Sequence, residues 1–141
     1  MHIVLPLFVG SLIYVLWRAP TLRVFRWIQL VGLQHAVFRA RALAAPLRPA
    51  LPGWALFSLP SGLWMYAMVS WFGATWKGAS SAWSCLWMLV ALVVGVGSEL
   101  GQLAGVVPGT FDTIDVVFYL LGWSAAFIRV MKRDIWIRHD T

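Results

Sequence analysis

The chain has 141 residues, of which 61% are hydrophobic and only 11% are charged, whereas soluble domains carry about 25% charged residues. This composition leaves no room for a separate soluble domain. The net charge of +6 does not indicate nucleic-acid binding, because the basic residues lie beside apolar stretches and no nucleic-acid-binding motif accompanies them. We therefore expect a single integral membrane domain over residues 1–141.

Four apolar stretches are predicted to be membrane spans, because a spanning helix needs about 17–25 predominantly apolar residues. They cover residues 1–17, 59–76, 82–103 and 111–131. We expect the first to be a retained span and not a cleaved signal peptide, since no basic region precedes it and no small-residue cleavage site follows it. The predicted fold is an all-α, polytopic membrane helical bundle with four transmembrane helices.

The segment between the first two predicted spans is rich in arginine. Its apolar run over residues 27–38 covers about 18 Å as a helix, which is short of a roughly 30 Å hydrocarbon core. We therefore expect an interfacial segment whose guanidinium groups contact lipid phosphates. The candidate residues are Arg18, Arg23, Arg26, Arg39 and Arg41. A short fifth span over residues 27–45 is the alternative.

The distribution of Lys and Arg predicts the orientation of the last span. The turn over residues 104–110 has no Lys or Arg, whereas the C-terminal tail carries Arg129, Lys132, Arg133 and Arg138. Because cytoplasmic loops are enriched in basic residues, we expect a multi-pass membrane protein with a cytoplasmic C-terminus. With four spans the arginine-rich segment then lies outside the cytoplasm, against the same rule.

Polar side chains gather where the third predicted span ends and the fourth begins. Glu99 lies in a long apolar stretch, and an ionisable residue inside a membrane span indicates a functional site by default. Gln102 follows three residues later and shares its helix face. Asp112, Asp115 and Tyr119 step along one face of the next helix. The short turn makes the two helices antiparallel neighbours, so we expect these polar faces to meet.

Glycines on the third predicted span indicate close helix packing. Gly95, Gly97, Gly101 and Gly105 form a surface of small residues, which allows helix backbones to approach closely in a membrane. We expect this surface to face the fourth span.

The polar pattern resembles the VanZ-like family of small bacterial membrane proteins. That family has Glu-x-x-Gln at the end of one span, a Pro-Gly-Arg-type turn, and then a paired acidic stretch, an Asn and a Gly on the next span. The matching residues are Glu99, Gln102, Pro108, Gly109, Asp112, Asp115 and Gly122. Thr110 stands in place of the usual Arg and Tyr119 in place of the usual Asn. The resemblance covers about residues 55–130. It implies a protein of the bacterial inner membrane, related to one linked to lipoglycopeptide resistance.

Structural roles are alternatives at several of these positions. Asp112 fits a helix N-cap with Asp115 at the N3 position, and Tyr119 fits a packing aromatic whose hydroxyl is satisfied. Gln102 fits a hydrogen bond to a neighbouring helix. No capping role explains Glu99, for which a cation is an alternative partner. The candidate cations are Arg18, Arg23, Arg26 and Lys77.

The favoured hypothesis is a binding or accessory protein of the cell envelope with an extracytoplasmic polar pocket. We expect this pocket to take a lipid headgroup, a lipid-linked envelope precursor or an amphiphilic antibiotic. Its predicted residues are Glu99, Gln102, Asp112, Asp115 and Tyr119. One alternative is a membrane-embedded enzyme that uses the carboxyl groups as acid and base on a lipid-linked substrate. Another is a structural subunit of a membrane complex.

Metal and nucleophile motifs are missing from the sequence. His2, His35 and His139 lie away from the polar cluster, and no metal-ligand spacing, phosphate loop or nucleophile elbow occurs. Cys85 is the only cysteine, which excludes an internal disulfide, and we expect it to pack in the bundle. We therefore predict no metal, no cofactor and no nucleic-acid partner, and we expect membrane lipids as partners.

Overall fold

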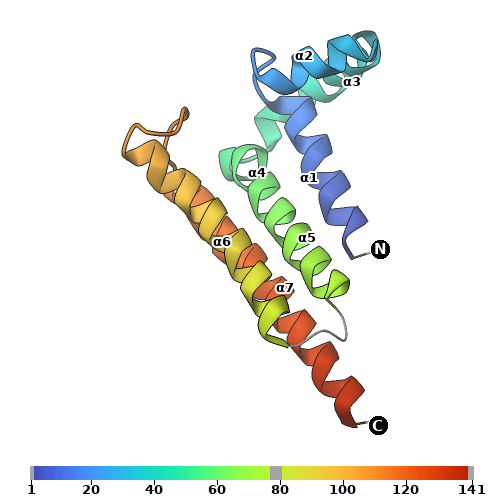
Figure 1. The fold of residues 1–141 in the computed structure, drawn as a ribbon. Coiled ribbons are helices and arrows are strands. Elements are labelled where there is room, and N and C mark those ends of the chain that lie inside the picture. The colour runs from blue at the N-terminus through green and yellow to red at the C-terminus, as the bar shows by residue number, and fades with distance from the viewer. Residues whose placement is uncertain (1, 77–80, 140–141) are drawn as a thin grey trace.

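The computed structural model describes residues 2–76 and 81–139, and the side chains of residues 2–76 and 82–132. Over this part of the chain the protein is helical, without strands, as predicted. Figure 1 shows the long helices running through the molecule and the short ones gathered at one end. The long helices are α1 (Val4–Trp17), α5 (Leu59–Thr75), α6 (Ser81–Leu103) and α7 (Thr113–His139). The short ones are α2 (Arg23–Leu30), α3 (Gln34–Ala44) and α4 (Gly53–Phe57), with a 3₁₀ turn, η1 (Ala45–Ala50), before α4.

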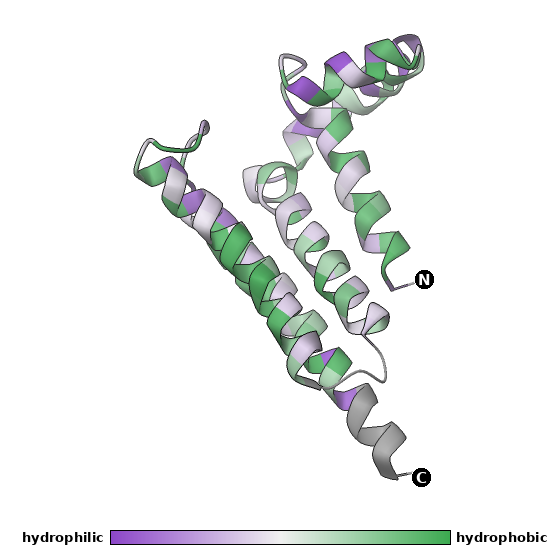
Figure 2. Cartoon of the chain, in the orientation of Figure 1, coloured by the Kyte–Doolittle hydropathy of each residue, from purple (hydrophilic) through white to green (hydrophobic). Residues whose placement is uncertain are grey.

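The four long helices coincide with the four predicted spans to within a few residues, apart from the end of α7, which continues to His139. Two of them, over Ala82–Leu103 and Thr113–Lys132, are long and apolar enough to cross a membrane. Figure 2 shows hydrophobic residues along most of α6. Helices α1 and α5 have 14 and 17 residues, or about 21 and 26 Å, which is less than the roughly 30 Å hydrocarbon core. Four membrane crossings therefore remain a prediction.

A continuous fifth helix over residues 27–45 does not form. The chain breaks between α2 and α3, where Gly32 has a φ of 76°, a backbone conformation that favours glycine. The N–H of Leu33 closes this turn by donating to the carbonyl of Ile28 at 3.0 Å. Both short helices lie across the end of α1 (Figure 1). The arginine-rich segment is thereby at the same end of the molecule as the turn between α6 and α7.

Helix α5 is the centre of the bundle and packs against α1, α6 and α7. Its closest approach is to α7, where Gly62 faces Gly122. A Cβ on Gly122 would collide with the carbonyl oxygen of Gly62 and would lie 3.0 Å from its carbonyl carbon. Further along the same pair, Gly73 leaves room for the side chain of Val130. Between these two points the core is formed by buried apolar side chains: Met65, Val69, Met88, Ala91, Ala126 and Val130.

The prediction that the glycines of α6 form the close contact with α7 is wrong, although α6 and α7 are packed antiparallel neighbours. A Cβ on Gly97 would meet no atom within 4 Å, and one on Gly101 would meet Val107 of the turn. Gly105 has a φ of 70° and ends the helix, so of the four only Gly95 faces side chains of other helices. Sequence periodicity alone does not say which glycine meets which helix, and the close backbone contact falls to Gly62 and Gly122.

Replacing Gly122 with Ala should destabilise the bundle, because the added methyl group collides with the backbone of Gly62 and neither backbone can yield without separating α5 from α7. Overpacking of this kind costs about 1–3 kcal/mol. The matched control is Gly97→Ala, which adds the same group in open space and gains up to about 1 kcal/mol of helix propensity. Thermal unfolding in detergent, followed by circular dichroism, measures both. Equal unfolding midpoints for the two variants would contradict the close contact between Gly62 of α5 and Gly122 of α7.

Candidate functional site

The end of α6 is shaped by a glycine-terminated cap. The N–H of Val106 donates to the carbonyl of Gly101 at 2.9 Å, and the N–H of Gly105 donates to the carbonyl of Gln102 at 3.1 Å. With Gly105 in the left-handed conformation, this pair of bonds is a Schellman motif. It ends the helix sharply and sends the chain back toward the start of α7.

Gln102 and the predicted Pro108–Gly109 turn lie against each other. Gly109 has a φ of 146°, and a Cβ there would lie 2.6 Å from the side-chain Cδ of Gln102. Glycine is thus required at this position by its conformation and by the closeness of the amide. The Gln102 side chain covers the turn on the side where α6 ends.

Asp112 is the N-cap of α7, as the capping alternative predicted. Its Oδ1 accepts a hydrogen bond from the N–H of Ile114 at 2.8 Å. Its carbonyl accepts from the N–H groups of Asp115 and Val116 at 3.1 and 3.4 Å. The bonds from Ile114 and Asp115 satisfy donors that a helix N-terminus otherwise leaves free, and the bond from Val116 is the first regular bond of the helix. The position of Asp112 therefore has a structural explanation.

Glu99 completes the same cap from the neighbouring helix. Its side chain is 3% exposed, and its Oε2 accepts the N–H of Asp112 at 3.3 Å. In a capping box the residue at N3 accepts this N–H, but here N3 is Asp115 and the acceptor comes from α6. The inference that Glu99 has no capping role is therefore wrong. Local patterns reveal caps within one helix, whereas this one depends on the turn that brings α6 beside α7.

Asp115 stands apart because one of its oxygens is unused. Its Oδ1 is buried and has no hydrogen-bond partner among the described residues. Glu99 experiences the charges of Asp112 and Asp115, and Arg18 attracts it electrostatically. Of the other suggested cations, Lys77 lies outside the described residues. The site is thus a group of carboxyl groups in which, within the described part of the chain, the Oδ1 of Asp115 is buried and unpaired, as is the Nε of Arg18.

Tyr119 connects the carboxyl groups to α5 and α6. It lies one turn beyond Asp115 on α7, and its hydroxyl interacts with the side chains of Ser61 and Ser98. Ser61, on α5, is 7% exposed. Sequence reasoning missed both serines, because serine is frequent in membrane helices and only the tertiary arrangement brings these two to the tyrosine. The one signal available was that Ser98 directly precedes Glu99.

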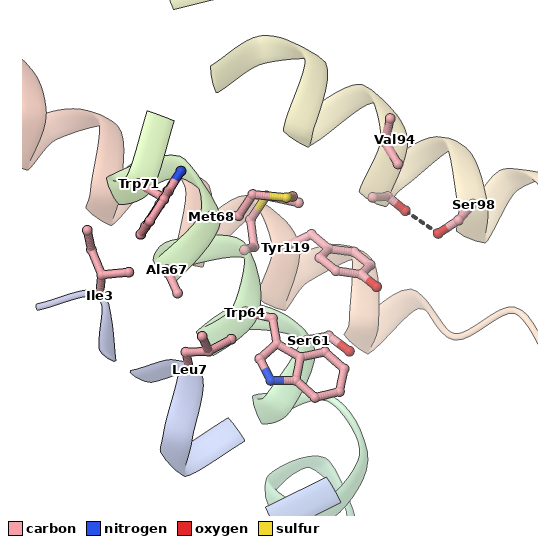
Figure 3. A pocket seen from close by; sticks show the side chains of 12 residues that line it. Ile3, Leu7, Ser61, Trp64, Ala67, Met68, Trp71, Val94, Ser98 and Tyr119 are labelled. Atoms are coloured by element: carbon pink, nitrogen blue, oxygen red, sulfur yellow. Dashed lines mark hydrogen bonds between the residues drawn. The ribbon is translucent and has the colours of Figure 1, made fainter. Parts of the chain in front are cut away.

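A cavity of about 430 Å³ begins at these three hydroxyl groups, and we call it the lateral groove. It lies over α5, between α1 and α6. Figure 3 shows the hydroxyls of Tyr119 and Ser61 turned to one side of the view, while the hydroxyl of Ser98 donates to the carbonyl of Gly95 at 2.7 Å. Apolar side chains form the rest of the wall. The principal apolar residues are Leu7, Trp64, Met68, Trp71 and Val94. No pattern in the sequence predicts this groove, because its wall comes from four helices.

The arginines predicted to contact lipid divide into two kinds. Arg41 donates to the carbonyls of Val15 and Arg18, the latter at 2.8 Å, and Arg18 donates to the carbonyl of Phe57 at 3.2 Å. These two guanidinium groups therefore satisfy carbonyls at the ends of α1 and α4. The exposed members of the set are Arg23, Arg26 and Arg39, and contact with lipid phosphates remains a prediction for them.

The residues that carry the family resemblance form one site, except Gly122, which contacts Gly62 where α7 packs against α5. Comparison with protein-family models, with curated proteins and with solved structures gave no match. Among the described residues, no three His, Cys, Asp or Glu side chains come together so as to hold a metal ion. The chemistry available to the site is therefore hydrogen bonding and charge at one end and apolar contact in the groove.

Replacing Asp112 with Ala should lower the free energy of unfolding by about 1 kcal/mol, because loss of an N-cap side chain costs 0.5–2 kcal/mol. Asp112→Asn should be nearly silent, since asparagine caps as well as aspartate. Chemical unfolding of both variants in detergent measures the difference. An Asn variant as unstable as the Ala variant would mean that the charge of Asp112, and not its cap, stabilises the fold.

Proposed function

We propose that this protein is a VanZ-like, multi-pass membrane protein that binds the polar head of an amphiphile in the cell envelope. The ligand class comprises lipid headgroups, lipid-linked envelope precursors and amphiphilic antibiotics. The observation that carries the proposal is a carboxyl cluster, in which the buried Glu99 lies with the half-buried Asp112 and Asp115, beside an apolar groove whose end is polar.

The surface of the long helices supports a membrane location. Only 22% of the apolar window of α6 and 11% of that of α7 is buried inside the protein. Large apolar side chains are also exposed on α1, including Val4 and Phe8. A contiguous apolar surface of this extent is unfavourable in water and favourable in a bilayer. In the proposed four-span protein, α1 and the central helix α5 are the two further crossings.

The open acceptor on Asp115 supports ligand binding. A buried polar atom without a partner costs about 1–3 kcal/mol, and buried polar atoms in proteins are nearly always paired. An N–H or O–H group of a ligand would pair with this oxygen. Glu99 and Asp112 are already bonded to backbone N–H groups, so they hold the site in place while Asp115 remains free to bind.

The proposed orientation places the C-terminus in the cytoplasm and the carboxyl cluster on the extracytoplasmic side. The basic residues after residue 128 support it. The arginines of α2 and α3 lie at the opposite end, with the turn that follows α6. If these arginines act at the lipid surface, they contribute headgroup contacts on the outer side, where the site opens.

Topology mapping tests this orientation. A reporter fused after Thr141 should show the activity of a cytoplasmic fusion. In a Cys85→Ala background, Leu30→Cys and Val106→Cys, which replace side chains 83% and 80% exposed, should both react with a membrane-impermeant maleimide on intact cells. Labelling of only one would contradict the placement of α2 at the same end as the turn, and labelling of neither would invert the orientation.

Glu99→Gln should weaken ligand binding while preserving the fold. The amide oxygen of Gln can still accept the N–H of Asp112, so the cap is kept and only the charge is lost. Because Glu99 acts on a bound head through its charge and not through a hydrogen bond, we expect a loss of about tenfold in protection against envelope-active amphiphilic antibiotics, which corresponds to about 1.4 kcal/mol. The measurement is the inhibitory concentration in cells that express equal amounts of each variant.

Asp112→Asn is the control for this test, because it keeps the cap and lies in the same cluster. It should reduce protection less than Glu99→Gln does. If the wild-type protein protects cells and both variants protect them equally well, the carboxyl cluster serves only to join α6 to α7, and the protein is better described as a structural subunit.

A further inference from the structure

We infer that the lateral groove binds the hydrocarbon chain of a long-chain amine, which enters sideways from the bilayer and places its ammonium group beside Tyr119, Asp115 and Glu99. This inference rests on the proposed function and narrows it, since it adds a chain-binding groove and selects a cationic head among the polar heads considered above.

The shape of the groove suits one extended chain. Along α5 it runs from Ser61 to Trp71, a distance of about 15 Å at 1.5 Å per residue. Its lining includes Leu7 on the α1 side and Val94 on the α6 side. Because Val94 is 62% exposed and Trp71 60% exposed, the groove opens along its side as well as at its polar end. A chain can therefore enter from lipid without leaving the apolar phase.

The polar end must supply the selectivity. Lipid tails are as apolar as the walls of the groove, so transfer of a chain from the bilayer brings no hydrophobic gain. The head of the amphiphile, in contrast, meets the hydroxyls of Ser61, Ser98 and Tyr119. Tyr119 in turn lies within the electrostatic reach of Glu99 and Asp115.

The charge of this end favours a cation. The carboxyl groups of Glu99, Asp112 and Asp115 lie just beyond the residues that line this end, and Arg18 attracts Glu99 electrostatically. The guanidinium of Arg18 also donates to the carbonyl of Phe57 and lies over the rings of Tyr14 and Phe57. A phosphate or carboxylate head would be repelled by the carboxyl groups.

A primary ammonium group matches both requirements of the site. It adds positive charge among the carboxyl groups and supplies three N–H donors. These donors can reach the hydroxyl oxygens of Tyr119 and Ser61, which line the end of the groove. Asp115 lies one turn before Tyr119 on α7, outside the lining, and acts on the ammonium group through its charge.

Photolabelling of the full chain in lipid nanodiscs tests the inference. The probe is a saturated primary amine with a diazirine in mid-chain, compared with the alcohol and the carboxylic acid of the same chain length. We expect the amine to label peptides of α5 and α6 that line the groove more than the alcohol does, and the acid to label them least. Asp115→Asn should remove the preference for the amine over the alcohol and leave labelling by the alcohol unchanged.

Val94 and Val93 provide a matched pair for the groove itself. Both are 62% exposed on α6, but only Val94 lines the groove. Val94→Trp should fill it and reduce labelling by about tenfold, whereas Val93→Trp should leave labelling unchanged. Equal thermal midpoints of the two variants show that both are folded.

Several outcomes would overturn the inference. One is equal labelling of the two tryptophan variants, and another is stronger labelling by the acid than by the amine. A third is that the amine fails to label and the protein forms a dimer that Val94→Trp dissociates, which would mean that a second copy covers the groove. Antibiotic protection separates the two proposals. If Glu99→Gln loses protection, Val94→Trp keeps it and the amine does not label the groove, then the chain-binding groove is rejected and the proposed function is kept. Groove labelling by the amine in a protein whose protection does not depend on Glu99 would reject the proposed role in the envelope.

Discussion

The backbone contact between Gly62 and Gly122 sets the distance between α5 and α7, and the candidate site depends on that distance. Ser61 directly precedes Gly62, and Tyr119 lies one turn before Gly122. When the two glycines meet without side chains between them, the serine and the tyrosine hydroxyl are brought together. Van der Waals packing of small residues is the main force that joins helices where no water is present. The contact that holds the bundle together therefore also builds the polar end of the lateral groove.

Glu99 shows how one buried carboxylate can serve structure and function together. By accepting the N–H of Asp112 it ties the end of α6 to the start of α7, and it places negative charge at a helix N-terminus, where the helix dipole favours it. The bond also fixes the side chain next to Asp115. A binding site benefits from such rigidity, since ligand binding then requires little ordering of side chains. A structural role for Glu99 is thus compatible with a role in recognition.

Two of the arginines that composition suggested as lipid contacts instead donate hydrogen bonds to backbone carbonyls of the protein. Helix C-termini leave carbonyl groups unpaired, and Arg41 reaches from α3 to those at the end of α1. Its guanidinium also lies 5.0 Å from the centre of the Phe25 ring, which joins α2 to the same arrangement. Arg18 does the equivalent for α4. Helices α2 and α3 are consequently attached to the bundle, and their exposed arginines are held at one end of it.

Sequence alone determined the helices and their limits, because these depend on local properties. Runs of apolar residues, Pro60 in the first turn of α5 and Asp112 before α7 act within a few residues of the chain, and the four long helices form close to where they were predicted. The N-cap role of Asp112 was available for the same reason. The limit of this reasoning appeared at Gly32, where a single glycine turned a candidate span into two short helices.

Tertiary structure decided everything that depends on which helix faces which. The glycines of α6 gave a clear small-residue pattern, yet the backbone contact formed between Gly62 and Gly122, because periodicity fixes a face and not its partner. Likewise the partner of Glu99 is an N–H thirteen residues away, on another helix. The lateral groove has no sequence signature at all, since a cavity is the space left when four helices pack, and its volume depends on all of their contacts at once.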